Sequence, residues 1–300
     1  MKYLSVKEMA EKWNLSVRTV RNYCAMGKIP GAFLTGKTWN IPEDAVQPDR
    51  INKAKKQPQT LLEVLKTERT NKISGGIYHK IQIDLTYNSN HIEGSRLTHD
   101  QTRYIYETNT IGADAGPLNV DDIVETANHF KCIDMIIEQA NYSLSEAFIK
   151  QLHLTLKSGT SDARKDWFAV GDYKRLPNEV GGKQTVTPEE VHGRMKRLLD
   201  TYNQKKTKTL EEIIEFHYQF ELIHPFQDGN GRVGRLIMFK ECLRNNIVPF
   251  IIDEELKLFY YRGLQQWKSE RGYLLDTCLR GQDKFKVYMD YFRIPYEMNI

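Results

Sequence analysis

Apolar residues along most of the chain recur every three or four positions, which is the period of an amphipathic helix. Strand signals, such as strict alternation of apolar and polar residues, are sparse beyond residue 60. We therefore expect a mainly α-helical domain over residues 60–300. The pattern predicts helices over residues 61–67, 77–90, 99–108, 120–140, 145–156, 188–203, 210–223 and 231–245.

The first 48 residues carry the signals of a separate small domain. The capping box Ser5-Val-Lys-Glu8 precedes one short helical segment, and Ser16 offers an N-cap to a second one after a tight turn. Between residues 29 and 41, prolines and glycines separate short apolar pieces, which is typical of a small hairpin or wing.

Residues 3–47 thereby resemble the winged helix-turn-helix of excisionases and MerR-type regulators. In that family the second helix enters the major groove of DNA, and its outward-facing side chains contact phosphates and base edges. The alternative is a helical module that docks on a protein, since helix-turn-helix patterns are short; we favour DNA. The side chains that the resemblance assigns to DNA are Arg18, Thr19, Arg21 and Asn22.

Residues 49–59 are polar and basic and include a proline. Such a composition cannot bury enough apolar surface to belong to a core. We therefore predict a DNA-binding domain over residues 1–48, a linker over 49–59 and a second domain over 60–300.

Bulk composition excludes several classes of protein. No run approaches the roughly 20 apolar residues that a membrane span requires, and no signal-peptide core follows the first residues. The four cysteines are far apart, which argues against a disulfide framework or a zinc site. The formal net charge of +4 is too small to identify a nucleic-acid binder by itself. We expect a soluble, cytoplasmic protein with no membrane partner and an oligomeric state that the sequence leaves open.

The segment 224–235, His-Pro-Phe-Gln-Asp-Gly-Asn-Gly-Arg-Val-Gly-Arg, carries the candidate chemistry. The proline disfavours helical geometry at the histidine before it, and the glycines at 229 and 231 favour a tight turn. The turn leads into a helix N-terminus, where backbone N–H groups favour an anion. The segment thus combines a titratable base, a hard-cation ligand, an anion cradle and two arginines that suit phosphate oxygens.

These residues fill every fixed position of the Fic-family signature, His-x-Phe-x-Asp/Glu-Gly-Asn-Gly-Arg-x-x-Arg. Residues 60–295 therefore resemble a Fic domain. The resemblance implies a mainly helical Fic fold with a small β-hairpin flap. It also implies transfer of AMP from ATP to a Ser, Thr or Tyr hydroxyl of a target protein, this protein itself included.

The resemblance also implies roles for individual residues. His224 would act as general base on the target hydroxyl, and Asp228 would hold Mg²⁺ across the phosphates of ATP. The N–H groups of residues 229–231, with Asn230, would stabilise charge at the α-phosphate, and Arg232 would bind the pyrophosphate portion. Phe226 is expected to anchor the loop in the core. The residues implied to bind the nucleotide are Gly229, Asn230, Gly231, Arg232, Arg235, Tyr260 and Tyr261.

Upstream, Ser89-Asn-His-Ile-Glu93-Gly94 matches the inhibitory pattern of the same family, Ser/Thr-x-x-x-Glu-Gly/Asn. An ordinary helix ending is the alternative interpretation, because the i,i+4 spacing and a final glycine are common there. The resemblance implies an inhibitory helix over about residues 77–94. In it Glu93 would pair with Arg235 and occupy the space that the γ-phosphate of ATP needs.

Residues 171–182 resemble the flap of the family, an edge hairpin that holds the target chain extended. Other readings of the whole chain stay open. Within enzymes, they are UMP, phosphocholine or phosphate transfer and removal of AMP, although the intact loop 229–232 argues against the Doc-type kinase branch. Outside enzymes, the chain would be a DNA-binding regulator that uses its Fic domain as a nucleotide sensor.

Overall fold

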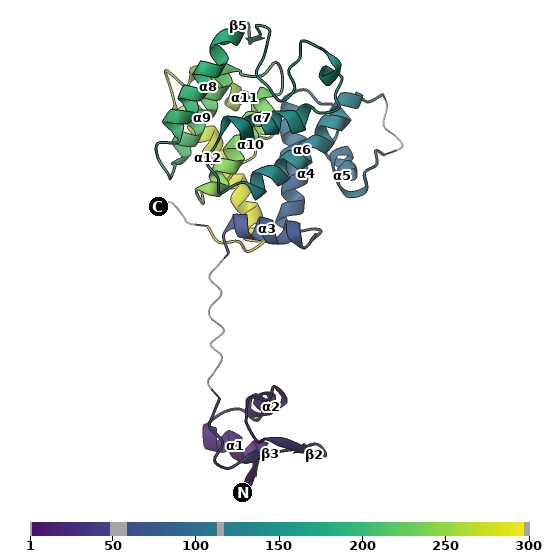
Figure 1. The fold of residues 1–300 in the computed structure, drawn as a ribbon, viewed down its shortest axis with the longest axis vertical. Helices are drawn as coiled ribbons and strands as arrows, with labels where there is room; N and C mark the ends of the chain where they lie inside the picture. The colour runs from purple at the N-terminus through teal and green to yellow at the C-terminus, as the bar shows by residue number, and fades with distance from the viewer. Residues whose placement is uncertain (1, 49–58, 113–116, 297–300) are drawn as a thin grey trace. The chain divides into compact units, whose positions relative to one another are not determined.

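The computed structural model describes residues 2–48, 59–112 and 117–296. They fall into two compact units, Met1–Gln57 and Pro58–Ile300 (Figure 1). The predicted linker at residues 49–59 lies outside the described residues except for Gln59. The second unit is mainly helical with a small hairpin, and the first unit packs two short helices with a three-stranded antiparallel sheet, so the predicted fold class is confirmed.

The N-terminal unit contains both predicted short helices. Ser5 forms the predicted capping box with Glu8, and the Ser16 side chain accepts a hydrogen bond from the N–H of Thr19. The sheet order is β1-β3-β2, and all pairs are antiparallel. Strand β1 was not predicted, because three residues are too few to show a period. The elements are β1 (Tyr3–Ser5), α1 (Val6–Trp13), α2 (Val17–Ala25), β2 (Phe33–Thr35) and β3 (Thr38–Pro42).

The second unit is a bundle of helices around one long core. Helix α10 is buried on nearly all sides and contacts α4, α6, α7 and α9 (Figure 1). Its buried charged side chains are ion-paired, so a helix that is not apolar all round can still lie in the centre of the domain. The helices are α3 (Leu61–Thr70), α4 (Ile77–Ile92), α5 (His99–Thr108), α6 (Val120–Glu138), α7 (Glu146–Lys157), α8 (Pro188–Tyr202), α9 (Leu210–Ile223), α10 (Asn230–Arg244), α11 (Glu254–Gln266) and α12 (Gly272–Tyr291), with a short 3₁₀ turn at Asp162–Arg164.

The predicted helices of this unit are all present, and their ends differ from the predicted ends by at most three residues. Helices α11 and α12 were missed. Each has an interior glycine, which weakens a helical pattern in sequence. Gly263 is needed where these two helices pack, because a Cβ there would lie 2.7 Å from the Cα of Leu274. Close packing therefore explains a residue that reads as unfavourable.

The predicted hairpin is also present, as β4 (Glu179–Val180) paired with β5 (Lys183–Gln184). Its two-residue turn is Gly181-Gly182, and both glycines have positive φ, 56° and 74°. Such a turn matches the twist of a hairpin and requires residues that tolerate positive φ. No helix within the described ranges combines the length and the apolar character of a membrane span.

Candidate active site

The loop between α9 and α10 is held in an unusual backbone conformation at both ends. His224 ends α9 with φ 50° and ψ 62°, and its N–H donates to the carbonyl of Phe220 at 2.9 Å. Gly229 precedes α10 with φ 81°. Left-handed geometry is unfavourable for a histidine, so the packing around it must hold it there.

Two side chains of this loop, Phe226 and Asn230, fix its conformation. Phe226 is fully buried and stacks on His153 of α7, with ring centroids 4.0 Å apart. Asn230 bonds both backbone groups of Phe226, accepting from its N–H and donating to its carbonyl at 2.8 Å each. Phe226 is thus the predicted anchor. The amide of Asn230 is used within the loop, whereas the resemblance had it facing the α-phosphate.

His153 was missed by the sequence analysis, and it ties the loop to the segment before the hairpin. Its Nδ1 accepts from the N–H of Gly171 at 3.0 Å, which leaves Nε2–H to donate to the carbonyl of Asp228 at 3.1 Å. Burial lowers the pKa of His153 to about 3, so this tautomer stays neutral.

The imidazole of His224 is poised as a base. Burial, reinforced by the positive charge of Lys174, lowers the pKa of His224 to about 4. The ring is therefore neutral near pH 7 and has a lone pair free to accept a proton. Its Nδ1 lies 3.9 Å from Oε2 of Glu221, one turn back on α9.

Glu221 is a second residue that the sequence analysis missed. Burial, and then the charge of Glu93, raises its pKa to about 8, so the carboxyl group is mostly protonated at neutral pH. It lies between His224 and His217, whose Nε2 is 3.8 Å from Oε1. A Cβ on Gly234 would lie 2.8 Å from Oε1, so only a glycine there leaves room for this carboxyl.

Asp228 lies in a network of charges at the start of α10. Its Oδ2 accepts from Nζ of Lys157 at 2.7 Å and from Arg232 at 3.1 Å. Burial alone would raise the pKa of Asp228, but Arg232 and Lys157 outweigh it and hold the pKa well below its usual range. Glu125 on α6 completes the network by bonding both Arg232 and, at 2.5 Å, Lys157.

This network bears on the expected Mg²⁺. Within the described residues no cluster of three or more His, Cys, Asp or Glu side chains could enclose a metal ion. Mg²⁺, however, is commonly bound by one or two carboxylates together with substrate phosphates. The Asp228 side chain is 50% exposed beside the helix N-terminus, so the donor set fits Mg²⁺ when phosphates supply the other ligands.

Arg235, one turn further along α10, is held by the end of α4. It donates to Oε1 of Glu93 at 2.7 Å, to the carbonyl of Ser89 at 2.8 Å and to the hydroxyl of Ser89 at 3.1 Å. A Cβ on Gly231 would overlap the Glu93 carboxylate. Glu93 therefore lies directly over the first turn of α10, where the backbone favours an anion.

The two tyrosines that the resemblance assigns to the nucleobase differ in exposure. Tyr260 is buried, and its hydroxyl lies 2.7 Å from Nε2 of His217. His217 is thus a core histidine with a partner. Tyr261 is 38% exposed, and its hydroxyl donates to the carbonyl of Ile92 at 3.4 Å. Of the pair, Tyr261 alone has surface that a ligand could contact here.

Lys174 connects the hairpin to the loop between α9 and α10. Its backbone N–H donates to the carbonyl of Pro225 at 2.8 Å, and its ammonium donates to Asn178 at 2.7 Å and Thr185 at 2.5 Å. Burial lowers the pKa of Lys174 to about 8. Lys174 therefore attaches the start of the hairpin to the loop that follows His224.

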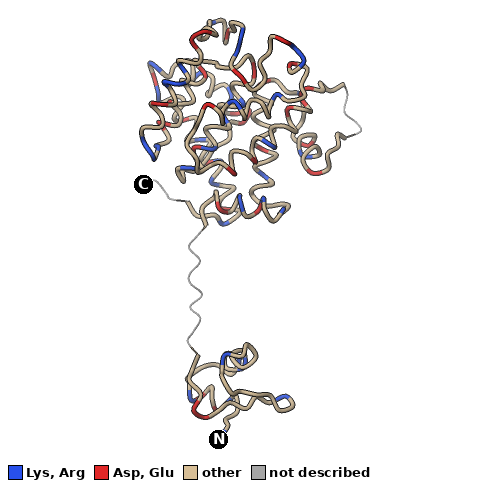
Figure 2. The backbone as a smooth tube through the Cα atoms, in the orientation of Figure 1, with Lys and Arg blue, Asp and Glu red and all other residues tan. Residues whose placement is uncertain are grey.

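In the N-terminal unit, the four residues assigned to DNA all lie on α2. Arg18, Arg21 and Asn22 are exposed. The hydroxyl of Thr19 is 2.8 Å from that of Ser16, so it belongs to the helix cap. Figure 2 shows basic positions on α2 and at the turn of the β2–β3 hairpin.

Comparison with known proteins agrees with this geometry. Residues 143–242 match the profile of the Fic/DOC family. The chain carries a Fic/DOC domain. Residues 3–47 match the profile described as a helix-turn-helix domain, so the Fic domain follows a helix-turn-helix unit in one chain.

Curated relatives of the Fic domain include a protein adenylyltransferase Fic from Drosophila willistoni, 30% identical over 188 residues, and protein adenylyltransferase fic-1 from Caenorhabditis elegans, 28% identical over 184 residues. The matches cover 60% and 59% of this chain. The chain spans only about a third of the length of these relatives, 35% in each case.

Solved structures confirm the predicted Fic fold. A Fic domain containing signaling protein from Bacteroides thetaiotaomicron is 26% identical, with a TM-score of 0.61 over 79% of this chain and 99% of that one. Fic-1 from C. elegans superposes with a TM-score of 0.59 at 21% identity, over 76% of this chain and 69% of that one.

Proposed function

We propose that the Fic domain transfers AMP from ATP to a Ser, Thr or Tyr hydroxyl of a protein. The observation that carries this proposal is a neutral, partly buried imidazole in the loop that leads to the N-terminus of α10, where backbone N–H groups, Asp228 and two arginines converge. Such a site suits a hydroxyl nucleophile and a phosphate electrophile. The adenylyltransferase relatives support the same reaction.

In the proposed reaction, His224 accepts the proton of the target hydroxyl. The hydroxyl oxygen forms a bond to the α-phosphorus as the bond from that phosphorus to the β-phosphate oxygen breaks, and pyrophosphate leaves with the electron pair. The backbone N–H groups of residues 229–231 stabilise the charge that develops on the α-phosphate. Arg232 faces the leaving group.

Asp228 is the residue that would hold Mg²⁺, which when bound neutralises phosphate charge. The Lys157 ammonium, 2.7 Å from Oδ2, keeps the Asp228 carboxylate ionised and oriented. His153 fixes the carbonyl of the same residue. The loop is therefore preorganised from two directions.

We further propose that Glu93 inhibits the transfer. Its carboxylate bonds Arg235 and overlies Gly231, so it competes with a phosphate of ATP for the same arginine and the same N–H groups. A nucleotide bound beside Glu93 would have its phosphates displaced from in-line geometry. Inhibition then ends when Glu93 moves or is removed.

The test is a labelling assay with the purified chain, Mg²⁺ and a cell lysate as the source of targets. With Glu93→Gly protein, α-labelled ATP should label protein and γ-labelled ATP should not. Adding His224→Ala should abolish the label, since the base is lost. Label from γ-labelled ATP would indicate phosphate transfer instead, and no label from either would sink the proposal and bring UMP and phosphocholine donors to the front.

A second function rests on the N-terminal unit. We propose that it binds DNA through α2, because Arg18 and Arg21 are exposed and form no ion pair within the described residues. Fluorescence anisotropy with a duplex oligonucleotide should give an affinity that falls steeply with salt. Each arginine changed to alanine should reduce the salt slope by about one if it contacts a phosphate. A salt-independent signal would contradict the proposal.

A further inference from the structure

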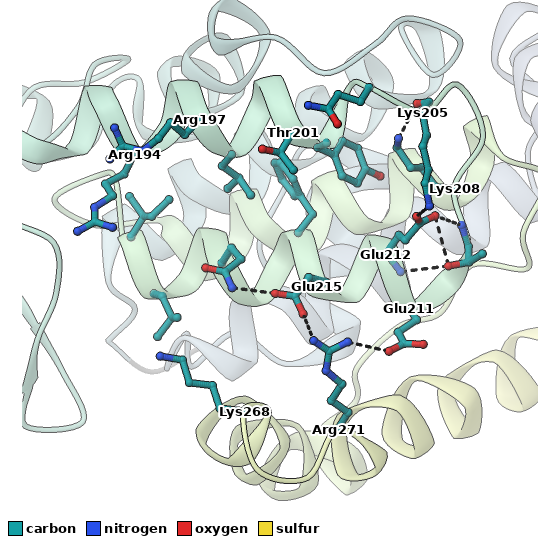
Figure 3. Close-up of a pocket in the computed structure, with 18 of the residues that line it drawn as sticks. Arg194, Arg197, Thr201, Lys205, Lys208, Glu211, Glu212, Glu215, Lys268 and Arg271 are labelled. Carbon is teal, nitrogen blue, oxygen red and sulfur yellow. Dashed lines mark hydrogen bonds and ion pairs between the residues drawn. The ribbon is translucent and has the colours of Figure 1, made fainter.

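A groove runs along the Fic domain between α8, α9 and the corner where α11 meets α12 (Figure 3). Its volume is about 930 Å³. It lies beside the proposed catalytic loop and outside it, because none of its lining residues belongs to the segment from His224 to Arg235. Its chemistry is therefore separate from ATP binding.

The groove is basic. Six basic side chains and three carboxylates line it. All three carboxylates are already paired inside the groove: Glu211 and Glu215 with Arg271 at 2.9 and 3.1 Å, and Glu212 with Lys205 (Figure 3). Of the other basic side chains, Lys208 is buried, whereas Arg194, Arg197 and Lys268 are exposed.

The unpaired charge lies mainly on α8. Arg197 is exposed and, like Lys268 across the groove, has no carboxylate partner in the part of the chain that the structure describes. Arg194, one turn earlier, has only a weak surface contact with Glu190 at 3.8 Å. Exposed pairs of this kind contribute little, so these three cations are available to an acidic partner.

The floor of the groove is apolar. Leu222 is 42% exposed there, although it lies next to the most buried part of α9. Leu198 and Phe216 continue the apolar strip toward the middle of the helices. An apolar floor with basic walls suits a peptide that carries both aliphatic and acidic side chains.

One end of the groove meets the proposed site. Ile223, which lines it, directly precedes His224, and Val186 follows the last residue of β5 by two positions. The ammonium of Lys174 links the segment after β5 to the end of α9, since it bonds Thr185 and lies 3.5 Å from the carbonyl of Ile223. The hairpin edge and this end of the groove are therefore close enough for one target chain to contact both.

We propose that this groove binds an acidic segment of the protein whose hydroxyl receives AMP. The inference rests on the proposed AMP transfer and adds the class of target. Helix α8 has 15 residues and so spans roughly 22 Å, the length of about seven extended residues. Arg194 and Arg197 lie in its middle, which places the acidic residues roughly three to five positions from the point where the target chain leaves the hairpin.

The experiment uses the full chain with Glu93→Gly and synthetic peptides as probes. Each peptide has Ser, Thr and Tyr in its centre. One set carries glutamates three to five positions before the centre, a second set carries them after it, and a third set carries lysines at the same positions. AMP-peptide is measured by mass spectrometry. One of the acidic sets should be modified with a kcat/KM at least tenfold above the lysine set, and the preference should shrink as salt rises.

Charge reversal locates the effect. The double substitution Arg194→Glu with Arg197→Glu should reverse the preference toward the lysine peptides. Lys196→Glu is the matched control, because Lys196 is exposed on the same helix and does not line the groove. The control should leave the preference unchanged.

The outcomes separate the two proposals. If no peptide and no lysate protein receives AMP, the proposed transfer itself fails. If peptides receive AMP equally regardless of charge, or if Lys196→Glu acts like the double reversal, only the groove proposal fails. Tight binding of a single-stranded oligonucleotide that the double reversal abolishes, without any peptide preference, would assign the groove to nucleic acid and overturn the inference.

Discussion

Arg232 and Arg235 lie on adjacent turns at the start of α10, and both are buried against a carboxylate from another helix. Their partners differ. Glu125 comes from the second turn of α6, is itself buried and also bonds Lys157. Glu93 is the C-cap residue of α4, and its side chain is 30% exposed and has a single basic partner among the described residues.

The difference distinguishes a structural ion pair from the ion pair that we propose to be inhibitory. Removing Glu125 would take from Lys157 and Arg232 the shared carboxylate that is itself buried and leave them only the half-exposed Asp228 in common, so we interpret that pair as part of the fold. Removing Glu93 leaves Arg235 bonded to the hydroxyl and carbonyl of Ser89 and frees the position that the Glu93 carboxylate held. We therefore interpret the Glu125 pair as permanent and the Glu93 pair as a contact that a phosphate can replace.

The largest expected effect is on stability, when the permanent Glu125 pair is broken. Glu125→Gln should lower the free energy of unfolding by about 3–5 kcal/mol, because Lys157 and Arg232 lose a buried partner. For a domain of this size, that corresponds to a fall in Tm of roughly 6–20 °C. Thermal unfolding followed by circular dichroism measures it, with the surface variant Glu138→Gln as control. A fall of less than about 2 °C would show that the pair is not structural.

A smaller effect is expected from Ser89→Ala, which removes one of the three hydrogen bonds to Arg235. The cost should be about 1 kcal/mol, and AMP transfer should rise a few-fold because Glu93 loses part of the framework that fixes its partner. Initial rates with α-labelled ATP test this. A fall in the rate would mean that Ser89 serves the active state.

The smallest effect concerns pH. Lys174 helps burial to lower the pKa of His224, so Lys174→Met should raise that pKa. His224 must be neutral to accept a proton, so activity is lost as the pH falls through its pKa. In the variant, this loss should begin at a higher pH, by less than about one pH unit. The pH profile of kcat/KM in the Glu93→Gly background measures the shift. An unchanged acid limb would remove Lys174 from the electrostatics of the site.

Much of this site could be predicted from the sequence because it is local. The segment from His224 to Arg235 contains its base, its turn and its helix start within one loop. The i,i+4 spacing of Ser89 and Glu93 also puts both groups on one helix face. In the N-terminal unit, Ser5 and Ser16 announced the helix starts for the same reason.

The supporting residues could not be predicted, because their partners are distant in sequence. Glu125 and Lys157 are single charged residues in otherwise ordinary helices, and only packing of α6 and α7 against α10 brings them to Arg232 and Asp228. Glu221 had one local signal, its spacing of three residues from His224. The need for a glycine at position 234 becomes visible only in the structure, where a Cβ would meet the Glu221 carboxyl.

The most direct test of the account measures rate and stability on the same samples of Glu93→Gly and Glu125→Gln. We predict that Glu93→Gly raises AMP transfer from α-labelled ATP at least tenfold over the unmodified chain, while Tm falls by only a few degrees, about 1–2 kcal/mol. Glu125→Gln should lose both activity and stability. If Glu93→Gly instead loses rate and Tm together, as Glu125→Gln does, then Glu93 is part of the fold and the proposed inhibition is contradicted.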